Sequence, residues 1–215
     1  MIKERLIGYI EDSIRQNWEI EALSNYREKG YTYRQIAEHI LKIHIFFRDT
    51  GIGEGDKIAL VGRNSANWCM IYLATVTYGA VIVPTLPDFK PDDLMNLINH
   101  SDSKILFVDD KIFETIDSSK IPGIKASVSV DTLKMIKSAD KTVSGVYDSV
   151  EDRFSREYPA LKPEDIRFSA VGNDKLAVIS YTGGTTGFSK GVMLSHNSLA
   201  ANVRFAQENM PLKPG

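Results

Sequence analysis

The segment from Gly55 to Pro87 reads GDKIALVGRNSANWCMIYLATVTYGAVIVPTLP, and it decides the fold because its apolar pattern changes twice. Two short apolar runs, KIALV (57–61) and AVIVP (80–84), have the length and residue types of buried strands. Between them, Ser65 opens a segment with apolar residues at helical spacing, and Gly79 ends it. A strand, a helix and a second buried strand predict a parallel β-α-β unit.

The alternation of strands and helices continues on both sides of this unit. Upstream, Thr32 and Gln35 form a capping box that predicts a helix over residues 33–48. The sequence therefore predicts an α/β fold whose parallel or mixed sheet has helices on both faces. The downstream elements that complete the series are a helix from Pro91, a strand at 104–108, a helix near 111–116 and a strand at 126–130.

The second half of the chain begins with a polar region from about residue 138 to 173, which predicts at most one short helix. We interpret it as an excursion that separates residues 1–165, the N-terminal α/β part, from residues 166–215, the start of the next subdomain. The last part is expected to contain a strand at 175–180, a returning strand at 191–194, and a helix from the Ser195 cap to about Gln207.

A glycine-rich loop follows the strand at 175–180, and the stretch from Tyr181 to Leu194 reads YTGGTTGFSKGVML. Glycines allow backbone N–H groups to converge, threonines add hydroxyl donors, and Lys190 adds a positive charge. This donor set predicts a phosphate-binding loop, and it is denser than a flexible hairpin turn needs. It does not fit a Walker loop, because Phe188 and Ser189 separate the last loop glycine from Lys190. It does not fit the dinucleotide fingerprint either, since Thr182 stands where the first glycine would be.

The loop resembles the phosphate-binding motif of the adenylate-forming (AMP-binding) enzymes, YTSGTTG followed by any residue and PKG. The resemblance extends upstream, where GYTYRQIAEHI and the segment 55–87 are similar to the acyl-CoA synthetase branch, particularly its long-chain fatty-acid CoA ligases. It covers most of the chain, thinly before Tyr31 and between about Ile116 and Asp174. The matching loop residues are Tyr181, Thr182, Gly184, Thr185, Thr186, Gly187, Lys190 and Gly191.

The resemblance implies an enzyme that uses ATP and Mg²⁺ to convert a carboxylic acid to an acyl-adenylate, and then transfers the acyl group to coenzyme A. The small-molecule acid is expected to be a fatty acid. Charge that builds on the leaving pyrophosphate would be stabilised by fixed donors in the loop. The expected nucleotide-binding residues are Thr182, Gly183, Gly184, Thr185, Thr186, Gly187 and Lys190.

Two loop residues depart from the family motif. Gly183 replaces a serine and removes one hydroxyl donor, and Ser189 replaces a proline and removes a rigid φ angle. In the family, the catalytic lysine and the magnesium-binding glutamate lie downstream of this loop. We therefore interpret the chain as the N-terminal fragment of a longer ligase that is inactive alone, and we assign it no catalytic residue and no metal ligand.

Other functions stay open beside the ligase. A non-catalytic nucleotide-binding module and transfer of the acyl group to a carrier protein are the alternatives, and a different phosphotransferase is disfavoured by the lysine spacing. The net charge of -2 without long charge runs argues against nucleic acid as a partner. Some long-chain relatives associate peripherally with membranes, although no basic amphipathic helix here indicates this. The single cysteine, Cys69, and a charged N-terminus favour a cytoplasmic location.

Several chemically active side chains receive a structural interpretation. The four histidines lack metal-ligand spacing, so we expect helix-surface or capping roles for them, with His196 in the first turn of the last helix. Asp109 and Asp110 resemble a carboxylate pair that binds metal, but helix capping explains them with fewer assumptions. Trp68 and Tyr72, four residues apart, are expected to pack in the core.

Overall fold

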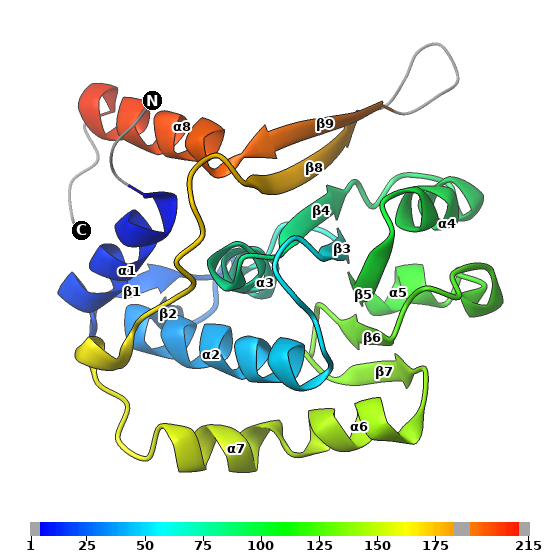
Figure 1. Ribbon diagram of the computed structural model, residues 1–215, viewed down its shortest axis with the longest axis horizontal. Coiled ribbons are helices and arrows are strands. Elements are labelled where there is room, and N and C mark those ends of the chain that lie inside the picture. The colour runs from blue at the N-terminus through cyan, green and yellow to red at the C-terminus, as the bar shows by residue number, and fades with distance from the viewer. Residues whose placement is uncertain (1–4, 183–189, 211–215) are drawn as a thin grey trace.

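Figure 1 shows a computed structural model of the chain, and it describes residues 5–182 and 190–210. The centre is a seven-stranded sheet in the order β7-β6-β5-β3-β4-β8-β9. The five inner strands run parallel, and the edge strands β7 and β9 run antiparallel to their neighbours. The strands are β3 (Lys57–Val61), β4 (Val81–Thr85), β5 (Ser103–Val108), β6 (Ala126–Ser129), β7 (Met135–Ser138), β8 (Leu176–Thr182) and β9 (Lys190–Ser195).

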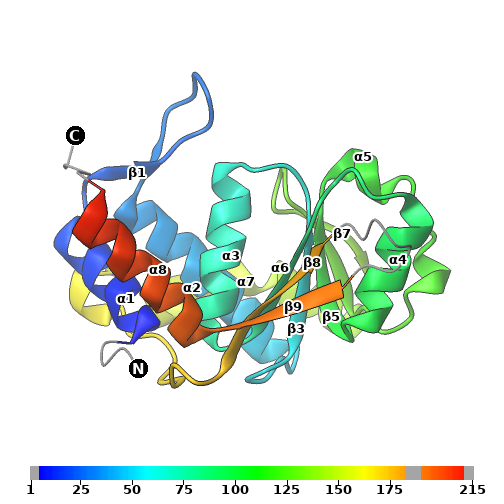
Figure 2. The ribbon, with the colours of Figure 1, turned by 90° about the horizontal axis from the view of Figure 1, so that it is seen from above.

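Helices cover both faces of this sheet, which confirms the predicted fold class (Figures 1 and 2). A separate two-stranded sheet, β1 (Glu21–Leu23) and β2 (Tyr31–Thr32), precedes the second helix, and short 3-10 turns cover Ser118–Lys120 and Pro163–Asp165. The helices are α1 (Leu6–Gln16), α2 (Tyr33–Asp49), α3 (Ala66–Tyr78), α4 (Pro91–His100), α5 (Asp110–Phe113), α6 (Lys141–Asp148), α7 (Val150–Glu157) and α8 (His196–Asn209).

The central strand β3 is buried on both sides, so its alternating side chains enter two different hydrophobic clusters. Ile58 and Leu60 pack with α2 and α3 on one face, through residues such as Phe47. Ala59 and Val61 pack on the opposite face with the first apolar turns of α4. This continuous apolar run is typical of a parallel strand that has helices on both faces.

Local capping signals explain where the two long central helices begin. Thr32 Oγ1 accepts a hydrogen bond from the Gln35 amide at 3.3 Å, and Gln35 Oε1 accepts one from the Thr32 amide at 2.9 Å, which confirms the capping box of α2. Ser65 Oγ accepts from the Trp68 amide at the start of α3. Gly79 ends α3 in the left-handed region, with φ of 91°.

The polar region 138–173 is more ordered than the sequence predicts. It contains two helices, α6 and α7, rather than one short helix at most, so that prediction is wrong. The Asp140 carboxylate caps α6 by accepting from the amides of Thr142 and Val143, a signal that the sequence carries. The sequence of α7 is predominantly polar, and the helix buries only Val150 among its eight residues. The helix α1 and the strand β7 were also missed.

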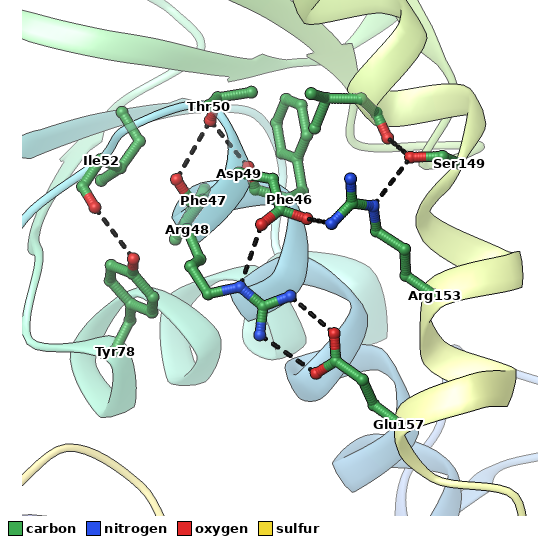
Figure 3. Close-up of polar contacts among 11 residues, drawn as sticks. Phe46, Phe47, Arg48, Asp49, Thr50, Ile52, Tyr78, Ser149, Arg153 and Glu157 are labelled. Carbon is green, nitrogen blue, oxygen red and sulfur yellow. Dashed lines mark hydrogen bonds and ion pairs between the residues drawn. The ribbon is translucent and has the colours of Figure 1, made fainter.

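Ion pairs attach α7 to the last turn of α2, as Figure 3 shows. Arg48 donates two hydrogen bonds to the Glu157 carboxylate, at 3.0 and 2.7 Å. Asp49 accepts from Arg48 Nε at 3.0 Å and lies 2.9 Å from Arg153 Nη1 of α7. Because the bidentate geometry fixes both side chains, a helix with little buried apolar surface still takes a defined position.

One histidine that was expected at a helix surface instead joins the two central helices. His44 on α2 has Nε2 2.9 Å from the Ala74 carbonyl oxygen and 3.1 Å from Thr77 Oγ1, both on α3. Its ring also contacts Tyr78 and Phe168 edge to face. Burial lowers the pKa of His44 from 6.5 to about 4.

The lowered pKa of His44 predicts a loss of stability at mildly acidic pH. Between pH 6.5 and 4 the His44 ring is protonated in the unfolded chain but not in the folded protein. The free energy of unfolding should therefore decrease as the pH is lowered through this range, by roughly 3 kcal/mol in total. His44→Gln removes the titrating group and should make the fall shallower in urea unfolding measured at several pH values. Some slope should remain, since burial also lowers the pKa of His39 and His196. Equal slopes in both proteins would contradict the prediction.

Among the described residues, no helix combines the length and the apolar character that a membrane span requires.

Candidate functional site

The β8–β9 hairpin carries the two ends of the predicted phosphate-binding loop (Figure 1). Thr182, the last residue of β8, and Lys190, the first of β9, are partners in the antiparallel ladder. Directly opposed residues of such a ladder point to the same face of the sheet. The Thr182 hydroxyl and the Lys190 ammonium group are therefore brought together, and both residues are exposed.

The remaining predicted donors, Gly183, Gly184, Thr185, Thr186 and Gly187, lie outside the described residues, as do the two departures from the motif. The structure thus places two of the seven predicted nucleotide-binding residues. The returning strand that the sequence predicts at 191–194 is present as β9, and Ser195 caps α8 by accepting from the Ser198 amide.

The residue that opens the motif, Tyr181, is fixed in the fold before the loop begins. It is 5% exposed and packs in a small apolar cluster with Val83 of β4 and Leu97 of α4. Its hydroxyl lies 2.6 Å from Nδ1 of His100, the last residue of α4, and the two rings meet edge to face. Sequence analysis missed His100, because a contact across 81 residues leaves no local signal.

Gly191 completes the base of the hairpin from the other strand. It is the ladder partner of Tyr181, and a Cβ atom at this position would lie 3.1 Å from Ile179 Cγ2 and 3.2 Å from Tyr181 Cε1. A side chain here would be tighter than ordinary van der Waals contact allows. The glycine after Lys190 therefore has a packing role that is separate from phosphate binding.

A depression of about 560 Å³ lies beside the hairpin, at the carboxyl ends of three parallel strands. Ligands of open α/β sheets commonly bind at this edge. Ser180, Tyr181 and Thr182 form one wall, and Trp68 contributes an aromatic surface that stacks on Tyr72 with ring centroids 5.5 Å apart. The remaining lining residues follow β3 and β4 and are Gly62, Arg63, Asn64, Pro84, Thr85, Leu86 and Pro87.

The point where β3 adjoins β5 is closed by a side chain of the protein. Asp109 was expected to cap the helix after β5, but its side chain makes no cap hydrogen bond, so this expectation is wrong. Its Oδ2 instead accepts from the Arg63 amide at 3.1 Å, across the ends of β3 and β5. Burial raises the pKa of the Asp109 carboxyl. The open part of this edge consequently lies toward β4 and β8.

His196 lies in the first turn of α8, as predicted, but it is buried rather than on the helix surface. Neither ring nitrogen has a hydrogen-bond partner among the described residues. Burial lowers its pKa, so the ring is neutral near pH 7. Within those residues there is also no group of three or more His, Cys, Asp or Glu side chains that could hold a metal ion.

The described part of the site offers donors for an anion. A hydroxyl and an ammonium group face one side of the hairpin, and the neighbouring depression is open to a ligand that extends from it. Such groups can bind phosphate oxygens through charge-assisted hydrogen bonds.

The packing role of Gly191 predicts that Gly191→Ala weakens the hairpin. The added methyl group should cost about 1–2 kcal/mol through contact with Ile179 and Tyr181. Hydrogen exchange of the amides in residues 176–195 should become faster, and the urea midpoint should fall.

Gly145→Ala in α6 is the matched control, because no atom lies within 4 Å of its added Cβ. Alanine is the better helix former, so this variant should gain about 0.5–1 kcal/mol. If Gly191→Ala is as stable as the wild type and its amides exchange as slowly, the hairpin accommodates the added methyl group at no cost and the prediction is wrong.

The chain is similar to known proteins in sequence and in fold. The chain is 28% identical to long chain acyl-CoA synthetase 5 of Arabidopsis thaliana, over 78% of this chain and 25% of that protein. It is 27% identical to the medium-chain fatty-acid–CoA ligase of Escherichia coli, over 81% and 30% respectively. An anthranilate CoA ligase solved with anthranoyl-AMP has the same fold, with a TM-score of 0.75 at 18% identity over 96% of this chain and 36% of that one.

The chain spans 36% or less of the length of the first curated relatives that it matches. The profile of the AMP-binding enzyme family matches residues 10–214, which is nearly the whole chain. The chain belongs to the AMP-binding enzyme family.

Proposed function

We propose that this chain is the N-terminal part of an ATP-dependent acid–thiol ligase. The complete enzyme would adenylate a carboxylic acid, specifically a long-chain fatty acid, and transfer the acyl group to coenzyme A. Membership of the AMP-binding enzyme family supports the adenylation step, and the similarity to two fatty-acyl CoA ligases supports the choice of acid and thiol. We further propose a cytoplasmic location and a division of the chain into residues 1–165 and 166–215.

One observation carries the proposal: Thr182 and Lys190 are paired at the base of a donor-rich loop, beside a depression at the carboxyl ends of parallel strands. When the acid attacks the α-phosphorus of ATP, negative charge builds on the leaving pyrophosphate. Donors that are already fixed in place stabilise this charge without having to reorganise. The β-ladder fixes the backbone positions from which the Thr182 hydroxyl and the Lys190 ammonium group would reach this charge.

The donor set fits the nucleotide phosphates. In our proposal Lys190 supplies positive charge, Thr182 and the hydroxyls of Thr185 and Thr186 supply neutral donors, and the amides of Gly183, Gly184 and Gly187 approach the phosphate oxygens. Mg²⁺ would bind mainly through ATP phosphate oxygens and water, as it commonly does.

Exchange of labelled pyrophosphate into ATP tests the adenylation step. In the complete gene product that contains this chain, exchange should depend on added acid and should be fastest with long-chain fatty acids, compared with acetate, medium-chain and aryl acids. The 215-residue chain alone should show none. Exchange with another acid class would retain adenylation and refute the fatty acid. A folded gene product that exchanges with no acid would favour a non-catalytic nucleotide-binding module.

Replacement of Lys190 tests the assigned phosphate contact. Lys190→Ala should weaken ATP binding in the complete gene product about 10-fold or more, since hydrogen bonds from charged groups contribute about 1.5–3 kcal/mol. Isothermal titration calorimetry gives the dissociation constant. Lys175→Ala is the matched control, because Lys175 is an exposed lysine of the same hairpin that lies just before β8, at the end opposite the loop. Equal affinities in the two variants would remove the role of Lys190.

A further inference from the structure

We propose that His100 is a positioning residue for nucleotide binding, which it supports through its hydrogen bond to Tyr181 at the base of the β8–β9 hairpin. His100 itself touches no reacting atom. By holding Tyr181, it would fix the direction in which Thr182 and Lys190 leave the sheet. This inference rests on the proposed phosphate-binding function of the loop.

The contact lies at the point where the hairpin needs support. The recorded ladder pairing between β4 and β8 consists of one register position, Ile82 with Val178. The part of β8 nearer the loop pairs with β9, as far as Thr182 with Lys190. Figure 1 shows this hairpin extending beyond the parallel strands toward the loop. Among the described residues no ladder position joins the loop end of β8 to β4, so side-chain contacts with β4 and α4 add to the constraint on it.

Tyr181 holds the loop end of β8 through both its ring and its hydroxyl group. Its ring packs in the apolar cluster with Val83 and Leu97, and Gly191 of β9 leaves room for it on the partner strand. Its hydroxyl reaches His100 at 2.6 Å, a short distance for an O–H···N hydrogen bond. The bond joins the last residue of α4 to the residue that immediately precedes Thr182. A change at His100 would thus be transmitted to a predicted phosphate ligand through one side chain.

The Tyr181 hydroxyl takes part in this hydrogen bond in its protonated form. Burial, and to a smaller extent the negative charge of Asp102, raise the pKa of the Tyr181 hydroxyl. The hydroxyl therefore keeps its proton at neutral pH, and it either donates to Nδ1 of His100 or accepts from Nδ1–H, according to the tautomer of the ring. An asparagine at position 100 could make this bond in either direction, through its amide oxygen or its NH₂ group, whereas alanine could not.

The inference is tested by ATP binding and by hydrogen exchange in the complete gene product. His100→Ala should raise the dissociation constant of ATP roughly 3- to 10-fold, the range expected for loss of one hydrogen bond. It should also speed amide exchange in residues 176–195 without nucleotide. His100→Asn should bind ATP and exchange these amides at values close to those of the wild type. The double variant His100→Ala/Tyr181→Phe should bind no more weakly than His100→Ala alone, because the two substitutions remove the same interaction.

Asn99→Ala is the matched control, since the neighbouring Asn99 donates its side-chain hydrogen bond to the Lys120 carbonyl oxygen, away from the hairpin. It should leave ATP affinity unchanged. If wild-type protein binds ATP and His100→Ala binds it equally well, the positioning role is wrong while the proposed function stands. If the wild type does not bind ATP, both fail. If His100→Asn and Asn99→Ala weaken binding as much as His100→Ala does, the effect is a general loss of α4 structure, and the positioning role is likewise wrong.

Discussion

The parallel pairing of β3 with β4 on one side and β5 on the other is the interaction on which the rest of the structure depends. Ile58 of β3 is in register with Ile82 of β4 and with Ile105 of β5, so three isoleucines form one continuous apolar layer. Parallel neighbouring strands must be joined by crossover connections, and these connections are right-handed. The chain moves from β3 to β4 in one direction across the sheet and from β4 to β5 in the other, so the two right-handed crossovers lie on opposite faces. This is why α3 and α4 cover different faces of β3.

The same pairing brings the carboxyl ends of the strands to one edge, where the candidate site lies. Asp109 closes the junction of β3 and β5 by binding the Arg63 amide, and the depression opens instead where β4 meets β8. The site therefore depends on the hairpin in which the parallel strand β8 turns back into the antiparallel edge strand β9. Its position is set by Tyr181, which reaches the last residue of α4 and has a glycine as its partner on β9.

Polar contacts help to position α7, at the outside of the molecule, on α2. The bidentate pair of Arg48 and Glu157 and the adjoining contacts of Asp49 hold α7 on α2 (Figure 3). Arg48 lowers the pKa of the Glu157 carboxyl, so this pair stabilises the fold at neutral pH and loses its effect only as the pH falls below the ordinary carboxylate range. A surface pair of this kind gives orientation more than it gives stability.

The sequence alone determined the β-α-β series, because the spacing of apolar residues, the capping residues and the glycine at the end of α3 are local properties. The structure confirms the strand at 57–61, the capping box at Thr32 and the Ser195 cap. It also identified the family, since the glycine–threonine loop is contiguous in the chain. Only the tertiary structure decided which strands are neighbours, that Asp109 binds Arg63, that His44 joins α2 to α3, and that His100 holds Tyr181. These contacts join residues far apart in the chain, and their partners are selected by packing rather than by local sequence, so no local pattern records them.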